Sequence, residues 1–167
     1  MAATYEPITT TTLSSNQSSV TLGSGGTISQ AYTDLVLVAN LACTSGSQRA
    51  SWRVNGDTGS NYAKTYVLGD GSSTASNRTA NETESYIFDG IALPTALTGN
   101  LIQHYQNYSD TNMYKTVLSR CNNPSGGTSL VVGLWRSTSA ITSITLTPSG
   151  GNWLSGSTFT LYGIKAA

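Results

Sequence analysis

The hydrophobic positions of this chain fall in short runs separated by turn-forming residues, and within several runs apolar and polar residues alternate. Alternation with a period of two is the pattern of a β-strand that buries one face. No window shows the spacing of an amphipathic helix. The pattern therefore predicts an all-β protein whose strands form the two packed sheets of a β-sandwich.

Eleven strands are expected, most of them bounded by Gly, Asn, Asp or Ser. The turn-rich segment Gly69–Glu84 has nearly no apolar residues and is expected to be an exposed loop. A chain of 167 residues has the size of one domain, so residues 1–167 are expected to fold as a single sandwich. The expected strands are Tyr5–Leu13, Ser19–Leu22, Asp34–Ala42, Arg49–Asn55, Tyr62–Leu68, Ser85–Phe88, Leu101–Tyr108, Tyr114–Arg120, Ser129–Trp135, Ile141–Thr147 and Thr158–Lys165.

Alternation within two of these strands identifies core residues. Ala50, Trp52 and Val54 share one face of their strand, and Trp135 also keeps a consistent face in its own strand. A strand with one wet side buries the opposite face. Both tryptophans are therefore expected in or near the core.

The run Leu35–Val38 is apolar on both faces, which is typical of a central strand that is covered on both sides. Either another segment of this chain or a neighbouring subunit can provide the outer cover. Because the net charge is zero and does little to keep copies apart, we expect a homotrimer with Val36 and Val38 at the subunit contact.

Serine and threonine make up 49 of the 167 residues, whereas only 16 residues carry formal charge. The hydrophobic fraction of 38% is modest, but the missing share is small polar residues rather than charge, so the chain is expected to fold. Eight basic residues balance eight acidic ones. This balance creates no field that attracts nucleic acid or an anionic membrane, and neither partner is expected.

We expect no enzyme and no catalytic, cofactor-binding or metal-binding residue. Zinc sites need about four Cys, His or carboxylate ligands, and the single histidine, His104, is expected to be structural or at an interface. Cys43 and Cys121 are expected to be buried free thiols, with a disulfide between them left open. A rival interpretation is a small glycan hydrolase in which Glu82 and Glu84 are the catalytic pair. The alternative interpretation of these two residues is that they are solvated acids in a loop without a catalytic role.

The aromatic residues favour rings with a polar edge: nine Tyr and three Trp against two Phe. Such rings suit interfaces, where they provide contact area and still form hydrogen bonds. Tyr105, Tyr108 and Tyr114 crowd one region of the sequence. They are half-buried sandwich residues, a subunit contact, or a platform on which sugars stack, and the sequence leaves the three possibilities open.

Residues 1–8 are expected to form an extended arm, with Tyr5, Pro7 and Ile8 as anchors, along a sheet edge of another chain. Pro7 cannot donate a ladder hydrogen bond, which favours an edge position. The opening MAATYEPITTTTL has neither a basic nor an apolar signal region, so we expect a product made and kept in the cytoplasm. No stretch approaches the roughly 20 apolar residues of a membrane helix.

Five stretches that span nearly the whole chain resemble a family of small virion structural proteins of tailed bacteriophages, particularly phages of cyanobacteria. The family includes proteins that resemble head decoration, or cement, proteins and others that resemble tail-associated fibre modules. The matching stretches are TYEPITTTTLSS, YTDLVLVANL, YKTVLSRCNN, VVGLWRSTSAITSITL and GSTFTLYGIKAA.

The resemblance implies an antiparallel, jelly-roll-like β-sandwich that is commonly trimeric and has no enzymatic activity or cofactor. The expected function is decoration of the phage head exterior, where a homotrimer clamps neighbouring major capsid subunits. The alternative is a tail fibre or receptor-binding module that contacts host-surface glycans. The residues expected at the capsid or subunit interface are Tyr5, Pro7, Ile8, Val36, Val38, Tyr105, Tyr108 and Tyr114.

Overall fold

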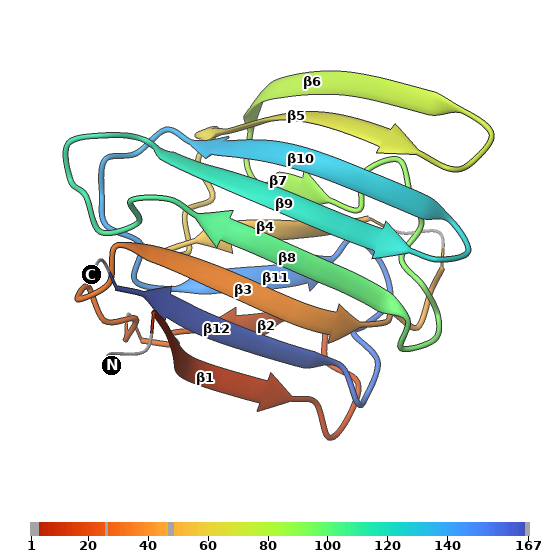
Figure 1. The fold of residues 1–167 in the computed structure, drawn as a ribbon, viewed down its shortest axis with the longest axis horizontal. Coiled ribbons are helices and arrows are strands. Elements are labelled where there is room, and N and C mark those ends of the chain that lie inside the picture. The colour runs from red at the N-terminus through yellow and green to blue at the C-terminus, as the bar shows by residue number, and fades with distance from the viewer. Residues whose placement is uncertain (1–3, 26, 47–48, 166–167) are drawn as a thin grey trace.

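The protein is seen in a computed structural model that describes residues 4–25, 27–46 and 49–165. These residues form twelve strands and no α-helix, so no helix among them could cross a membrane. The strands make two antiparallel sheets that lie one over the other (Figure 1). The predicted all-β fold is confirmed, and the two layers are those of a β-sandwich.

The larger sheet has eight strands and the smaller one has four. Figure 1 shows the smaller sheet behind the central strands of the larger one, with β1 and β6 at the outer edges. In spatial order the larger sheet is β1 (Tyr5–Thr12), β12 (Thr158–Ile164), β3 (Asp34–Leu41), β8 (Gly99–Tyr105), β9 (Lys115–Asn123), β10 (Gly127–Trp135), β5 (Tyr62–Gly69) and β6 (Thr74–Glu82). The smaller sheet is β2 (Val20–Leu22), β11 (Ile144–Pro148), β4 (Ala50–Val54) and β7 (Ser85–Ile87).

The expectation of a loop over Gly69–Glu84 is wrong, because most of this segment is the edge strand β6. An edge strand at the rim of the sandwich is exposed on both sides, so its sequence needs no alternation of apolar and polar residues. Asp70 makes the turn before β6 by accepting hydrogen bonds from the amides of Ser72 and Ser73 at 2.8 and 2.6 Å. These bonds hold the pKa of Asp70 well below its ordinary value.

The described part of the predicted N-terminal arm is also an integral strand. Tyr5, Glu6 and Pro7 lie opposite Ile164, Gly163 and Tyr162 of β12, in the same ladder as the rest of β1. A bulge between Pro7 and Thr9 accommodates the proline at the sheet edge. The expectation that residues 5–8 lie on another chain is therefore wrong, and residues 1–3 lie outside the described residues.

The core between the sheets is built around Trp52. Its ring meets Tyr62 and Tyr105 edge-to-face, with centroids 5.6 and 5.8 Å apart, and all three rings are fully buried. Gly133 of β10 faces this indole, and a Cβ atom there would lie 2.7 Å from the ring. Trp135 is buried in the same core, so both predicted core tryptophans are confirmed.

Both cysteines are free and buried, as expected. Burial raises the pKa of the Cys121 thiol to about 11, because the thiolate would lose its hydration in the core. Burial likewise raises the pKa of Tyr62 to about 12. The Tyr62 hydroxyl accepts a hydrogen bond from the amide of Val54 at 3.2 Å, which ties the larger sheet to the smaller one.

Substitution Gly133→Ala is expected to lower the free energy of unfolding by about 1–3 kcal/mol, because the added methyl group overlaps a rigid indole. Urea unfolding followed by tryptophan fluorescence measures the change. Gly69→Ala in the neighbouring strand β5 is the control, since its nearest neighbour would be 4.0 Å away. Equal stability of the two variants would contradict the proposed packing.

The free energy of unfolding is expected to decline from pH 9 towards pH 11. The unfolded chain loses the Cys121 proton near its ordinary pKa of 9.0, whereas the folded chain holds it to about 11. The stabilisation is therefore complete below pH 9 and is lost as the pH rises through the folded value. Cys121→Ala should decline less steeply in the same titration of urea unfolding, and an identical slope would contradict the assignment.

Candidate interaction surface

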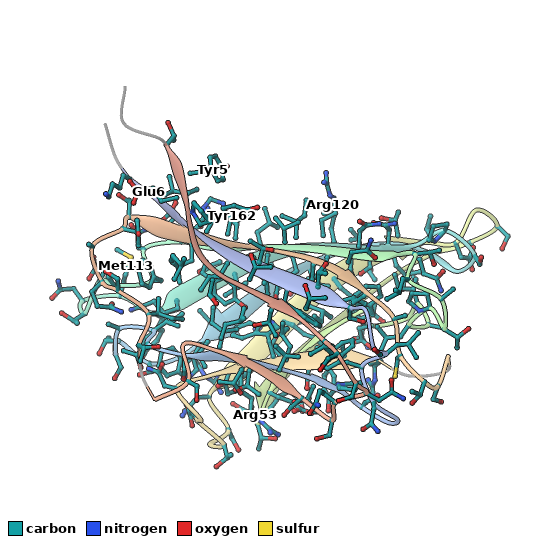
Figure 2. All side chains as sticks on the ribbon, turned by 90° about the horizontal axis from the view of Figure 1, so that it is seen from below. Tyr5, Glu6, Arg53, Met113, Arg120 and Tyr162 are labelled. Atoms are coloured by element: carbon teal, nitrogen blue, oxygen red, sulfur yellow. The ribbon has the colours of Figure 1, made fainter. Side chains whose placement is uncertain are left out.

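The main surface feature is the outer face of the eight-stranded sheet, which points away from the four-stranded sheet. Figure 2 shows the two layers edge-on, with Arg120 and Tyr162 projecting from this outer face and Arg53 lying on the far side of the smaller sheet. Within the described residues no segment covers the outer face. Most of the exposed large apolar side chains project from it, namely Val38, Val67, Leu118, Leu130 and Val132, together with Tyr5.

Strand register arranges these side chains in two rows across the sheet. Side chains that lie opposite one another on adjacent strands share a face and come into contact. The first row runs through Thr160, Val38, Ile102, Arg120, Leu130 and Val67. The second row runs through Tyr162, Val36, His104, Leu118, Val132 and Thr65.

The surface is hollowed where β5, β6, β9 and β10 meet. The hollow has a volume of about 650 Å³, and its walls include Val67, Leu130, Ala75 and Thr128. Arg120 also lines this hollow and is the charged residue among those that line it. We call the outer surface of β9, β10, β5 and β6, with Leu118, Arg120, Leu130, Val132, Val67 and Arg78, the Arg120 half-face.

The structure brings four of the eight predicted interface residues together on the other half of this surface. Tyr5 and Pro7 of β1 lie on the outer face with Val36 and Val38 of β3, on either side of β12. The rings of Tyr5 and Tyr162 are in edge contact, with centroids 6.3 Å apart. Tyr5, Pro7 and Val38 are exposed, whereas Val36 is buried between its neighbours. This group is available for contact with a partner.

Two of the predicted interface residues were assigned wrongly. Tyr105 and Tyr108 are fully buried in the core of their own chain, so neither ring can contact a subunit, a capsid or a sugar. The Tyr105 hydroxyl donates a hydrogen bond to the side-chain oxygen of Gln103 at 3.1 Å, and Tyr108 donates to the carbonyl of Ser29. These two polar ring edges are accommodated in the fold because each hydroxyl has a hydrogen-bond acceptor within the chain.

The other two predicted residues do not join the group on the outer face. Ile8 is half-buried and packs against the core, and Tyr114 is exposed in the loop between β8 and β9. The prediction missed Val67 and the apolar side chains of β9 and β10. Their signal was present, because Leu130, Val131 and Val132 form the same kind of two-faced apolar run as Leu35–Val38.

The buried charges of the chain are engaged in structural contacts. Lys64, which is 2% exposed, forms an ion pair with Asp89, and its Nζ lies 4.4 Å from the Tyr86 ring centroid. Arg49 also pairs with Asp89, at 3.2 Å. Lys115 is fully buried and donates hydrogen bonds to the carbonyls of Asp110, Met113 and Thr138. These bonds join two loops at one end of the sandwich. Burial lowers the pKa of Lys115.

Of the titratable groups considered for catalysis, His104 and Glu84 have side-chain partners, whereas Glu82 has neither a hydrogen bond nor an ion pair among the described residues. His104 bonds to Asp34 at 2.8 Å on the outer face, and Glu84 pairs with Arg53 at 2.9 Å and accepts a bond from Ser51. Among the described residues no group of three or more His, Cys, Asp or Glu side chains is placed to hold a metal ion. The outer face of the larger sheet is therefore the candidate contact surface, and the polar clusters described above hold parts of the fold together.

Comparisons with models of protein families, with curated proteins and with solved structures gave no significant match.

Proposed function

We propose that this chain is a non-enzymatic structural protein of a phage particle, a head decoration protein that associates as a homotrimer and clamps neighbouring major capsid subunits. The observation that carries the proposal is the uncovered apolar outer face of the eight-stranded sheet. Soluble monomers rarely expose a large continuous apolar patch unless it binds something. A protein that acts by contact alone needs such a surface and needs no reactive site.

The size of the outer face supports an assembly role. Strands lie about 4.8 Å apart and rise about 3.4 Å per residue, so the sheet covers roughly 34 Å by 24 Å, or about 800 Å². Each partner in a stable protein complex buries about 800 Å². One face of this sheet therefore offers about the area of one standard interface, and each of its halves offers about 400 Å², the area of a smaller contact.

The order of the strands supports the predicted jelly-roll-like architecture. The strands β1-β12-β3-β8 lie in one sheet and β2-β11-β4-β7 in the other, and the chain changes sheet at each step from β1 to β4. We infer a double Greek key that is enlarged by two hairpins, β5-β6 and β9-β10, which both join the larger sheet. These hairpins add the strands that carry the Arg120 half-face.

The sequence resemblance to phage virion proteins supports a place on the particle, and that family includes both head decoration proteins and tail-associated fibre modules. The alternative role in glycan binding depended on tyrosine rings as stacking platforms, and two of those three rings are buried. No other feature of the described residues favours it. The head assignment is tested with particles assembled without this chain: added protein is expected to bind them, raise their resistance to heat, and reach a copy number comparable with that of the major capsid protein.

Self-association is expected to depend on the exposed part of β3. Val38→Glu places a charge in the apolar row beside Ile102 and should reduce a trimer to monomers, because a carboxylate buried in the contact lacks a partner. Light scattering coupled to gel filtration measures the mass. Thr21→Glu, on the outer surface of the smaller sheet, is the matched control. A monomeric parent chain, or a trimeric Val38→Glu variant, would rule out this contact.

A further inference from the structure

We propose that the Arg120 half-face docks a different protein, one that presents carboxylates on an apolar surface, and that it does not bind a second copy of this chain. The inference deepens the proposed function, and rests on it only for the identification of that partner as a capsid protein. The inference rests on the strand register, on the unpaired charges and on the shape of the hollow. Figure 2 shows Arg120 projecting from the sheet into open space.

The neighbours of Arg120 on the outer face are mainly apolar. Ile102 and Leu130 lie opposite it on the adjacent strands, and Leu118 lies two residues before it on β9. Arg78 lies at the edge of the same half-face, in line with Thr65 and Val132. An exposed guanidinium among aliphatic side chains can bind an anion strongly once a partner excludes water from the site.

Neither guanidinium forms a hydrogen bond or ion pair within the described residues, and the hydrogen bond of Arg78 to the Asn77 side chain is donated by its backbone amide. All other basic side chains are engaged. Four form ion pairs and two donate to neutral oxygens: Arg49 and Lys64 to Asp89, Arg53 to Glu84, Lys165 to Glu6, Arg136 to Ser60 and Asn81, and Lys115 to three carbonyls. The two free cations therefore both lie on the one uncovered half-face.

Within the described residues, seven of the eight acidic side chains already form a hydrogen bond or an ion pair, so a second copy offers few free anions. Glu82 is the one acid among the described residues whose side chain forms no hydrogen bond or ion pair, and it lies opposite Tyr62, whose ring is buried in the core and not on the outer face. A second copy would bury two arginines without counter-ions, which is costly. The engaged acids are Glu6, Asp34, Asp57, Asp70, Glu84, Asp89 and Asp110.

The hollow beside Arg120 fits this chemistry. Its walls of Val67, Leu130 and Ala75 accept an aliphatic side chain, and the guanidinium at the same place accepts a carboxylate in bidentate fashion. A partner surface on which apolar and acidic residues alternate satisfies both requirements. Successive side chains of an extended strand point to opposite faces, so an apolar and an acidic residue must stand at positions i and i+2 to face the same surface.

The test uses the full chain and a short peptide of repeating Val-Ser-Glu-Ser, which places Val and Glu on one face of an extended strand, and binding is followed by amide chemical shifts. We expect shifts on β9, β10 and β5, and a loss of affinity of about tenfold or more in Arg120→Glu. Arg120→Lys should lose less, because it keeps the charge but not the bidentate geometry. Thr21→Glu, on the outer surface of the smaller sheet, is the control for added negative charge and should bind as the parent does.

Three further probes can overturn the inference. The same repeat with Lys in place of Glu should not bind, and the repeat with Thr in place of Val should bind more weakly because it lacks the apolar part. Equal binding of either peptide, or of a single-stranded oligonucleotide used as a polyanion, would refute the stated chemistry. No binding of the Val and Glu peptide would refute the docking site itself.

Sedimentation of the free variants separates a self-contact from a partner contact. Arg120→Glu and Leu130→Glu are expected to keep the oligomeric mass of the parent chain, and dissociation of either variant would show that the half-face binds a second copy. The result is independent of the proposed function, which is tested on the particles. A chain that binds the peptide but not the particles would keep this inference and overturn the head assignment.

Discussion

The packing of the four-stranded sheet against the inner face of the eight-stranded sheet is the interaction on which the other features depend. Trp52 occupies the centre of this contact, where Gly133 leaves room for the indole and Tyr62 and Tyr105 meet its ring. A tightly packed layer of large rings tolerates little change in volume. The contact decides which face of every strand in the larger sheet is buried, and so decides which face is left for partners.

The mismatch in strand number between the sheets has a direct consequence. One layer of eight strands has two faces, and this chain provides a second layer for only one of them. On the inner side, buried charged groups find partners within the chain, as the ion pair of Lys64 with Asp89 shows. On the outer side aliphatic side chains and Arg120 stay without partners in the described residues. The proposed contacts follow from this asymmetry between the two faces.

The two proposals divide the outer face between them. The β1, β12 and β3 half carries Tyr5 and Val38 and is assigned to self-association, whereas the Arg120 half-face is assigned to another protein. The division follows from charge. Apolar groups pack equally well against a second copy of the chain or against a different protein, whereas an unpaired guanidinium requires a carboxylate. A decoration protein needs both kinds of contact, one to hold its own subunits together and one to hold the shell.

The sequence by itself determined the strands with a buried face, the core tryptophans and the free thiols, because alternation and burial are local consequences of side-chain chemistry. It could not locate β6, since an exposed edge strand needs no apolar pattern, and it could not place Tyr105 and Tyr108, since a polar ring suits either a surface or a satisfied interior. The run Leu35–Val38 indicated a two-faced strand without showing what covers it. Only the tertiary structure decided that its outer side is open and that Arg120 is left without a carboxylate, because both depend on which strands become neighbours.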